Sequence, residues 1–561
     1  NGKVNVSGVV KVVDEVIWDG TQWKWFDDDE GTSGAWKTIV EPNQKLKAKI
    51  EGNYPASAPS FTCKKLTIDN GVSVTIGAGK YIRVINEIVN NNASASQFTV
   101  ESDGGLIQVN DASVNTGNIT VKRNANLKRL DYNYWGSPVS GQQLKAFSPG
   151  TLNSRFYIYQ ESNDSFVTVD PTTNFETGKG YAIRASNTAP TSITDPLATK
   201  DWSFIGIPNN GDVSFTLLKS STGNGYNLVA NPYPSNINLK QLYTSNNTDI
   251  TGTFYFWTNI NPNPAMQYAN YPLPGYYNNY ATYNLSGGNP PAHPTVTDAT
   301  EVNKITPEAV IKPGQGFIVQ ATGSGDGKLD FYNTHRVKDT NTKFFNNRMA
   351  SSNEVVDRYR VQLTTPLGLV NTILVAYKEG STLDFEGNYD AKLLVESPDS
   401  FYSKIGVDKM IIQGRGYPLN NNDVVELGTT FYQSGTHTFS IESKEGVFAN
   451  GQSIYLHDKL LNTYTNLQNE SYTFDVSQHG EINNRFEITY QPESTLSISN
   501  LEKEKVKIEK LKSFIDSLPK ENRLQASTYI QKLQEEWFYE TEKTKVILDF
   551  TKYIDSLKLS N

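Results

Sequence analysis

The stretch GYNLVANPYPSNI, residues 225–237, decides how the centre of this chain folds, because DYNYWGSPVSG at residues 131–141 resembles it. In residues 225–237, Tyr226 and Leu228 alternate like residues of a strand that enters a core. Pro232 follows them, which fixes the backbone and withholds an N–H group where the strand must end. We therefore predict a scaffold corner at each stretch rather than a catalytic or binding site.

Two further motifs follow each corner in the same order, which indicates an internal duplication. The first corner precedes FYIY at 156–159 and GKGYAIRA at 178–185, and the second precedes FYFW at 254–257 and GQGFIVQA at 314–321. The glycines of the G-x-G motif allow a turn with positive φ before an aromatic side chain that points into the core. We predict a duplicated β-module over residues 126–350, with an insertion at 258–310 in the second copy.

Short strands separated by turns occupy residues 1–125. In the clearest part a new strand begins about every eight residues. This spacing fits a β-solenoid, in which each short strand forms one face of a coil, and it also fits an antiparallel β-sandwich. We favour the solenoid, because the strands are short and no hairpin pair stands out.

Residues 351–497 contain eight candidate strands with turns between them, which predict a β-sandwich of the jelly-roll or immunoglobulin-like kind.

The last segment, residues 498–561, differs from the rest in being rich in Lys and Glu and lacking glycine. Apolar residues recur there at helical spacing. They are Ile508, Leu511, Ile515 and Leu518, then Ala526, Ile530, Leu533 and Trp537, and then Ile547, Phe550, Ile554 and Leu557. We predict an α-helical hairpin, or helices that pack on a protein partner.

The composition favours a mostly β fold class. The 561 residues include 31 Tyr and only 3 Met, and Gly, Pro, Asn, Ser and Thr are abundant before the last segment. These are residue types of strands and of polar loop tips. The net charge of −8, without a basic stripe, argues against nucleic acid as the main partner.

Cys63 is the only cysteine, so it forms no internal disulfide, and we expect it to be buried in a strand. No apolar run approaches the roughly 20 residues that a membrane-spanning helix needs. The first residues, NGKVNVSGVV, alternate like a strand and lack the pattern of a signal peptide. We therefore expect the chain to be a piece of a longer protein.

No catalytic motif stands out in the sequence. The five histidines occur neither in H-E-x-x-H nor at zinc-finger spacing, there is no G-x-S-x-G motif, and a single cysteine excludes a C-x-x-C site. A carboxylate pair for glycoside hydrolysis is assembled in space, so sequence spacing does not reveal it. We predict a protein without catalytic residues and without a cofactor, apart from a possible Ca²⁺ ion.

The candidate for Ca²⁺ is the acidic run FDDDEG. Its carboxylates belong to Asp27, Asp28, Asp29 and Glu30, and carboxylate oxygens are the ligands that Ca²⁺ prefers. The run lacks the spaced D-x-D-x-D pattern of calcium loops, so we favour a hydrated surface loop.

The insertion in the second copy combines tyrosine with asparagine and proline, which suits a contact surface for a glycan or protein ligand. The candidate ligand-binding residues are Trp257, Tyr268, Tyr271, Tyr276, Tyr277 and Tyr280. In the alternative interpretation, the tyrosines fasten a long loop to its own domain. We favour that alternative, because long loops need an internal core to stay ordered.

Twelve motifs in a fixed order resemble the C-terminal part of large surface proteins from gliding, flavobacterium-like bacteria. Such proteins are similar to cargo of the type nine secretion system, an adhesin-like, sorting-domain-containing family, and the resemblance covers roughly residues 18–495. The motifs are YNYWGSPVSG, GIPNNG, NLVANPYPS, FYFWT, YATYNLSGG, GQGFIVQA, FFNNRM, RYRVQLT, DFEGNYDAK, IQGRGYP, IYLHDKLLNTYTNL and NNRFEITY.

The resemblance implies export across the outer membrane, followed by display at the cell surface or release from it. It supplies no catalytic residues. Such proteins usually end in a β-sandwich sorting signal, whereas this chain continues into the Lys/Glu-rich segment. A mature cargo protein would have lost its sorting domain, so this difference is compatible with the resemblance.

Our first hypothesis is a non-enzymatic secreted or cell-surface protein, adhesin-like or structural, located outside a Gram-negative bacterium or on its outer membrane. Its expected partners are the secretion machinery during export and a surface glycan or protein. The alternative is a secreted carbohydrate-binding or polysaccharide-active protein, because the same folds carry those functions too.

Overall fold

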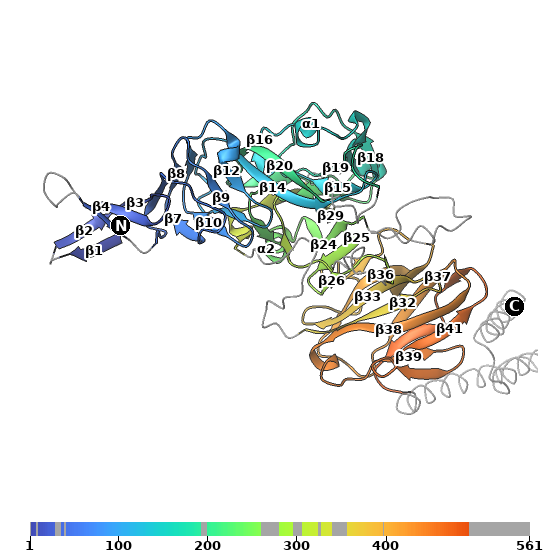
Figure 1. The fold of residues 1–561 in the computed structure, drawn as a ribbon. Helices are drawn as coiled ribbons and strands as arrows, with labels where there is room; N and C mark the ends of the chain where they lie inside the picture. The colour runs from blue at the N-terminus through green and yellow to red at the C-terminus, as the bar shows by residue number, and fades with distance from the viewer. Residues whose placement is uncertain are drawn as a thin grey trace, which may run out of the picture.

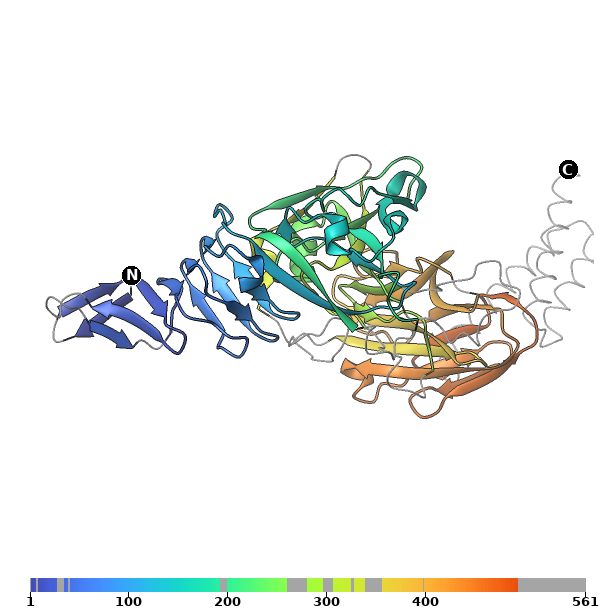
Figure 2. The ribbon, with the colours of Figure 1, turned by 45° about the horizontal axis from the view of Figure 1, so that its top comes forward.

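A computed structural model describes most of the chain, and its residues confirm the predicted mostly β fold class, with several sheets. The described residues are 2–6, 9–27, 35–38, 41–191, 199–259, 280–295, 306–323, 327–338, 356–396 and 398–492. In Figures 1 and 2 the N-terminal strands project from one end of the central body, and the C-terminal strands lie at the other end. None of the helices within these ranges is long and apolar enough to cross a membrane.

Three parallel ladders form most of the N-terminal region, and successive stretches of chain add strands to each in turn. The first ladder pairs β7 (Phe61–Cys63), β10 (Tyr81–Val84) and β13 (Gly105–Gln108). The second pairs β3 (Glu15–Trp18), β6 (Lys47–Ile50), β8 (Leu66–Ile68) and β11 (Ile88–Asn90). The third pairs β9 (Val74–Ile76), β12 (Phe98–Val100) and β14 (Ile119–Asn126).

In most of these short strands alternate residues are buried, and in β12 and β13 every residue is buried, so the three ladders enclose one apolar core. Cys63 belongs to this core with no exposed surface, which confirms the expected buried position, and burial raises the pKa of its thiol. Two antiparallel strand pairs accompany the ladders: one precedes them, and the other extends the second ladder beyond β3. They comprise β1 (Gly2–Val6) with β2 (Val9–Val13), and β4 (Trp23–Asp27) with β5 (Ala35–Thr38).

The two copies of the repeated motifs form two sheets with the same strand order. The first-module sheet runs β15 (Tyr132–Trp135), β19 (Tyr181–Arg184), β17 (Phe156–Gln160) and β18 (Ser165–Thr168). The second-module sheet runs β22 (Tyr226–Ala230), β29 (Gly316–Ala321), β24 (Ile250–Trp257), β25 (Tyr280–Asn284) and β26 (Gly287–Asn289). The second sheet thus repeats the order of the first and adds one strand.

The corner that follows each first strand leads into a short helix, α1 (Leu144–Phe147) or α2 (Leu239–Asn246). In the second corner the Asn231 side chain accepts a hydrogen bond from Tyr233 N at 3.0 Å and donates one to Ser235 O at 2.8 Å. Asn231 has no exposed surface. The corner is therefore a piece of scaffold, as the sequence predicts.

The G-x-G motifs adopt the predicted backbone. Gly178 has φ of +80° and Gly314 has φ of +67°, a region that side chains rarely occupy. The aromatic residues that follow, Tyr181 and Phe317, are 1% and 0% exposed. Both elements of the prediction, the positive φ and the inward aromatic residue, are confirmed.

Each G-x-G turn docks on the first strand of the other module. Gly180 N donates a hydrogen bond to Leu228 O at 3.0 Å, and Ala230 N donates one to Gly178 O at 2.9 Å. In the reciprocal contact, Gly136 N donates a hydrogen bond to Gly314 O at 3.0 Å. The two modules are thereby locked together by equivalent contacts.

Two small sheets complete the second module. Strand β20 connects the first module to the N-terminal region. The small sheets contain β21 (Val213–Thr216), β23 (Asn236–Asn238), β28 (Val310–Ile311), β30 (Lys328–Phe331) and β31 (Arg336–Val337). Strand β20 (Thr199–Pro208) pairs antiparallel with β14 and with β16 (Val139–Ser140). The N-terminal ladders and the modules are therefore joined by sheet hydrogen bonds.

The C-terminal strands form one 13-stranded sheet, and this sheet curls into a nearly closed barrel. It also includes β27 (His293–Pro294). The sequence predicts a β-sandwich over this range. The other strands are β32 (Asp357–Thr364), β33 (Leu369–Lys378), β34 (Ala391–Lys392), β35 (Ser400–Ile405), β36 (Asp408–Gly416), β37 (Val425–Phe431), β38 (Gly435–Glu445), β39 (Tyr455–Asp458), β40 (Thr463–Asn466), β41 (Tyr472–Val476), β42 (Gly480–Ile482) and β43 (Phe486–Thr489).

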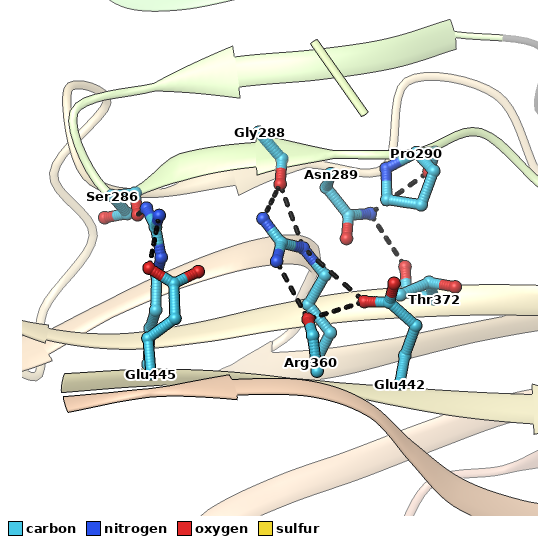
Figure 3. A network of polar contacts seen from close by, with 10 residues as sticks. Ser286, Gly288, Asn289, Pro290, Arg360, Thr372, Glu442 and Glu445 are labelled. Carbon is cyan, nitrogen blue, oxygen red and sulfur yellow. Dashed lines mark hydrogen bonds and ion pairs between the residues drawn. The ribbon is translucent and has the colours of Figure 1, made fainter. Parts of the chain in front are cut away.

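A polar joint connects the C-terminal sheet to the second module (Figure 3). Arg358 Nη1 donates a hydrogen bond to Ser286 O at 3.0 Å, and Arg360 Nε donates one to Gly288 O at 3.1 Å. The Asn289 side chain donates another to Thr372 O at 2.7 Å. The two arginine bonds satisfy carbonyl groups at the far edge of the second-module sheet, and the Asn289 bond reaches a carbonyl of β33, so β26 is not left as an open edge.

Candidate binding surface at the junction of the modules

A buried tyrosine layer fills the space where the two module sheets face each other. Tyr134 from the first module contacts Tyr280 from the second, and Tyr280 in turn contacts Tyr255. Leu228 and Ile318 belong to the same cluster. The hydroxyl groups of Tyr134 and Tyr280 lie 2.6 Å apart. Burial raises the pKa of Tyr280 to about 12, so its phenol is neutral and forms hydrogen bonds rather than carrying charge.

Two of the candidate ligand-binding residues, Trp257 and Tyr280, lie in this layer. The Trp257 ring stacks on Tyr134 with centroids 6.0 Å apart. Trp257 Nε1 donates a hydrogen bond to Asn259 Oδ1 at 3.2 Å, and the Asn259 amide donates one to Tyr132 O at 2.7 Å. The structure therefore places both residues at the base of the insertion, where they join the module sheets.

The other four candidates, Tyr268, Tyr271, Tyr276 and Tyr277, lie outside the described residues. The same holds for Asp28, Asp29 and Glu30 of the calcium candidate, whereas Asp27 ends strand β4. Among the described ranges, no group of three or more His, Cys, Asp or Glu side chains could hold a metal ion. The predicted helices at 498–561 also lie beyond the described part of the chain.

An open groove of about 890 Å³ lies between the first module and strand β21. Both apolar and polar side chains line it. The apolar ones include Ile158, Val167, Phe215 and Leu218, and the charged ones include Lys179 and Lys219. Leu218 is 50% exposed, so the groove offers apolar surface to a ligand.

A buried carboxylate fixes one wall of the groove. Glu161 is 3% exposed, and its two oxygens accept hydrogen bonds from Ser220 N and Gly225 N, each at 2.9 Å. Burial raises the pKa of Glu161, but these hydrogen bonds outweigh burial and hold the pKa below its ordinary value. Nearby, Thr222 Oγ1 donates a hydrogen bond to Ser162 O at 2.8 Å. Hydrogen bonds thus hold the loop from the second module against the first module.

Sequence reasoning misses Glu161, because QESND reads as a solvated polar turn. Its partners Ser220 and Gly225 lie about 60 residues away in the chain, as the separations of 59 and 64 residues show. No local signal indicates that contact.

The Tyr134–Tyr280 hydroxyl pair allows a test of the structural role of Tyr280. Changing either residue alone to Phe leaves the other hydroxyl buried without its partner, which costs about 1–2 kcal/mol of unfolding free energy. Changing both removes the unpaired group, so we expect the double variant to lose clearly less than the sum. Urea unfolding of the wild type, both single variants and the double variant measures this coupling. Strictly additive losses would show that the two hydroxyls do not interact.

Comparisons with known proteins place the chain in a family. A family model described as Domain of unknown function (DUF8693) matches residues 17–490. No curated protein and no solved structure matches the chain. The matched range includes both module sheets, the groove, the N-terminal ladders and the C-terminal sheet. Because it covers most of the 561 residues, the chain belongs to the DUF8693 family.

Proposed function

We propose that this chain is a non-enzymatic, adhesin-like surface protein that binds an extended ligand in the groove between its modules. The observation that carries the proposal is that hydrogen bonds hold one wall of the groove in place. Because Glu161 and Thr222 hold the wall in place, the groove needs little ordering when a ligand enters it. Its volume of about 890 Å³ lies within the usual range of ligand sites.

The chemistry of the groove favours binding over hydrolysis. A general acid for glycoside cleavage needs a carboxyl group with a raised pKa. Glu161 is the buried carboxylate at this site, and its hydrogen bonds hold its pKa below the ordinary value. Both of its oxygens are already used as acceptors, so it serves as a structural clamp.

The remaining regions fit a displayed protein. We infer that the N-terminal ladders form a short β-solenoid, which acts as a stiff spacer because each parallel strand rests on the one before it. The segment 498–561 is proposed as a helical hairpin that packs on itself or on a protein partner, on the strength of its apolar periodicity.

Export by the type nine secretion system, to the outer-membrane surface or the medium of a Gram-negative bacterium, completes the proposal. Its support is the ordered series of motifs between residues 18 and 495. The secretion machinery is then a transient partner, and a surface glycan or protein is the lasting one.

Blocking the groove tests the binding site. Thr216 lines the groove and is exposed on β21, so Thr216→Trp fills the space without disturbing a core. On an array of immobilised polysaccharides and extracellular proteins, we expect the wild type to bind at least one component. We expect the variant to bind it about tenfold more weakly, since a filled site loses its contacts. Ser140→Trp, an exposed change on edge strand β16, is the matched control and should bind like the wild type. Equal binding by both variants, or no binding by the wild type, would contradict the groove as the site.

Protease accessibility tests the proposed location. In the bacterium that carries the gene, we expect the protein to be digested by proteinase K added to intact cells, or to be detected in the medium. Inactivating the type nine secretion machinery should leave the protein inside and protected. The export proposal would be overturned if the protein in unmodified cells were protected from the protease and no protein were found in the medium.

A further inference from the structure

Two arginines and two tyrosines form a row across one face of the first-module sheet. Tyr132 on β15 lies directly opposite Arg184 on β19, and Ala182 on β19 lies opposite Tyr157 on β17. Because alternate residues of a strand share a face, Tyr132, Arg184 and Tyr157 belong to the same face, which also carries Tyr134, and Tyr157 packs against the edge of the buried tyrosine layer. Arg155 precedes β17, and its Nη1 donates a hydrogen bond to the Tyr157 hydroxyl at 2.9 Å.

Neither arginine of this row has an acidic partner among the described residues. Arg184 is 7% exposed, and its guanidinium donates one hydrogen bond, from Nη2 to the neutral Asn187 amide oxygen at 3.1 Å. The Nε groups of Arg184 and Arg155 are buried and meet no acceptor in the described structure. The neighbouring acid, Asp131, accepts a hydrogen bond from Lys128 N instead.

The strand register places the two arginines next to each other. Phe156 on β17 lies opposite Ile183 on the antiparallel strand β19, so Arg155 and Arg184, one position further along, are neighbours. Burial raises the pKa of the Tyr132 phenol, with Tyr157 adding to the rise, while Arg155 and Arg184 both act to lower it. Both guanidinium groups therefore lie within electrostatic reach of one hydroxyl. Like charges placed side by side on a sheet repel each other, and a buried charge without a counter-charge is unfavourable. An anion bound between the two groups would remove both penalties.

The groups around the arginines suit a sugar that carries the anion. The rings of Tyr132 and Tyr157 meet edge to face, with centroids 5.8 Å apart. Aromatic rings present apolar faces to sugar rings, and amides such as the exposed Asn187 side chain exchange hydrogen bonds with hydroxyl groups. Guanidinium groups bind carboxylates through paired hydrogen bonds. A point anion such as free phosphate would use only the arginines.

We propose that Arg155 and Arg184, flanked by Tyr132 and Tyr157, form a binding site for an acidic sugar of a polysaccharide, with a uronate carboxylate between the guanidinium groups. Arg155 is only half-buried, so the site can be reached from solvent. The two arginines are separate from the groove, because Arg155 lies three residues, or about 10 Å at 3.3 Å per residue, before Ile158, the first residue of β17 that lines the groove. Their variants are therefore distinct from those that test the groove.

The experiment uses the full chain and a galacturonate hexamer as the probe, with calorimetric titration at low salt. We expect the wild type to bind, with an affinity that falls as salt is added. Arg155→Gln with Arg184→Gln should weaken binding about tenfold or more, because each loses a charge-assisted pair of hydrogen bonds. The single variant Arg155→Gln changes only the half-buried arginine, so the sheet keeps the buried Arg184. Arg83→Gln, a half-buried arginine on the N-terminal ladder β10, is the matched control and should bind like the wild type.

Further probes decide the chemical class. Dextran sulfate distinguishes a sulfate ester from a carboxylate, neutral dextran tests for the sugar ring alone, and inorganic phosphate tests for a simple anion. The proposal requires the uronate oligomer to bind more tightly than all three. It would be overturned if the wild type did not bind the hexamer, if Arg155→Gln and the double variant bound it as well as the wild type, or if any of the three other probes bound equally well.

Discussion

The reciprocal docking of each glycine turn on the first strand of the other module is the contact on which the rest of the structure depends. The approach is so close that a Cβ on Gly180 would lie 2.6 Å from Leu228 Cγ, and one on Gly316 would lie 2.7 Å from Tyr134 Cβ. Only glycine fits at either position. Because the two turns are equivalent, the two sheets are held face to face by one interaction that is used twice.

This docking creates both proposed binding features. It brings the sheets close enough for tyrosines from both modules to form a shared layer, and it leaves an open groove beside β21 that Glu161 closes on one side. The arginine row lies on the same sheet, around the start of β17. A polymer-binding protein gains from such a frame, because a rigid surface loses little conformational entropy on binding.

The sequence predicts the strands and turns of the modules better than it predicts the proposed binding sites. The repeated motifs predict the strands, the corners and the positive φ of Gly178 and Gly314, because these depend on local residue types. The sites depend on contacts between distant segments. Arg155 and Arg184 are far apart in the chain, and only strand register brings them together. Trp257 and Tyr280 are candidate ligand residues, and the structure places them in the junction of the modules, a position that composition does not predict because it does not tell what an aromatic side chain packs against.

The most direct test of this account measures the free energy of unfolding of Gly180→Ala and Gly316→Ala against Gly323→Ala. Among the residues that the structure describes, no atom lies within 4 Å of a Cβ added to Gly323. None of the three glycines has a positive φ, so the close approach distinguishes Gly180 and Gly316 from Gly323. We predict that Gly180→Ala and Gly316→Ala each lose about 1–3 kcal/mol through overpacking, whereas Gly323→Ala changes little. If the three variants were equally stable, the modules would not be held together by these turns, and the account would be wrong.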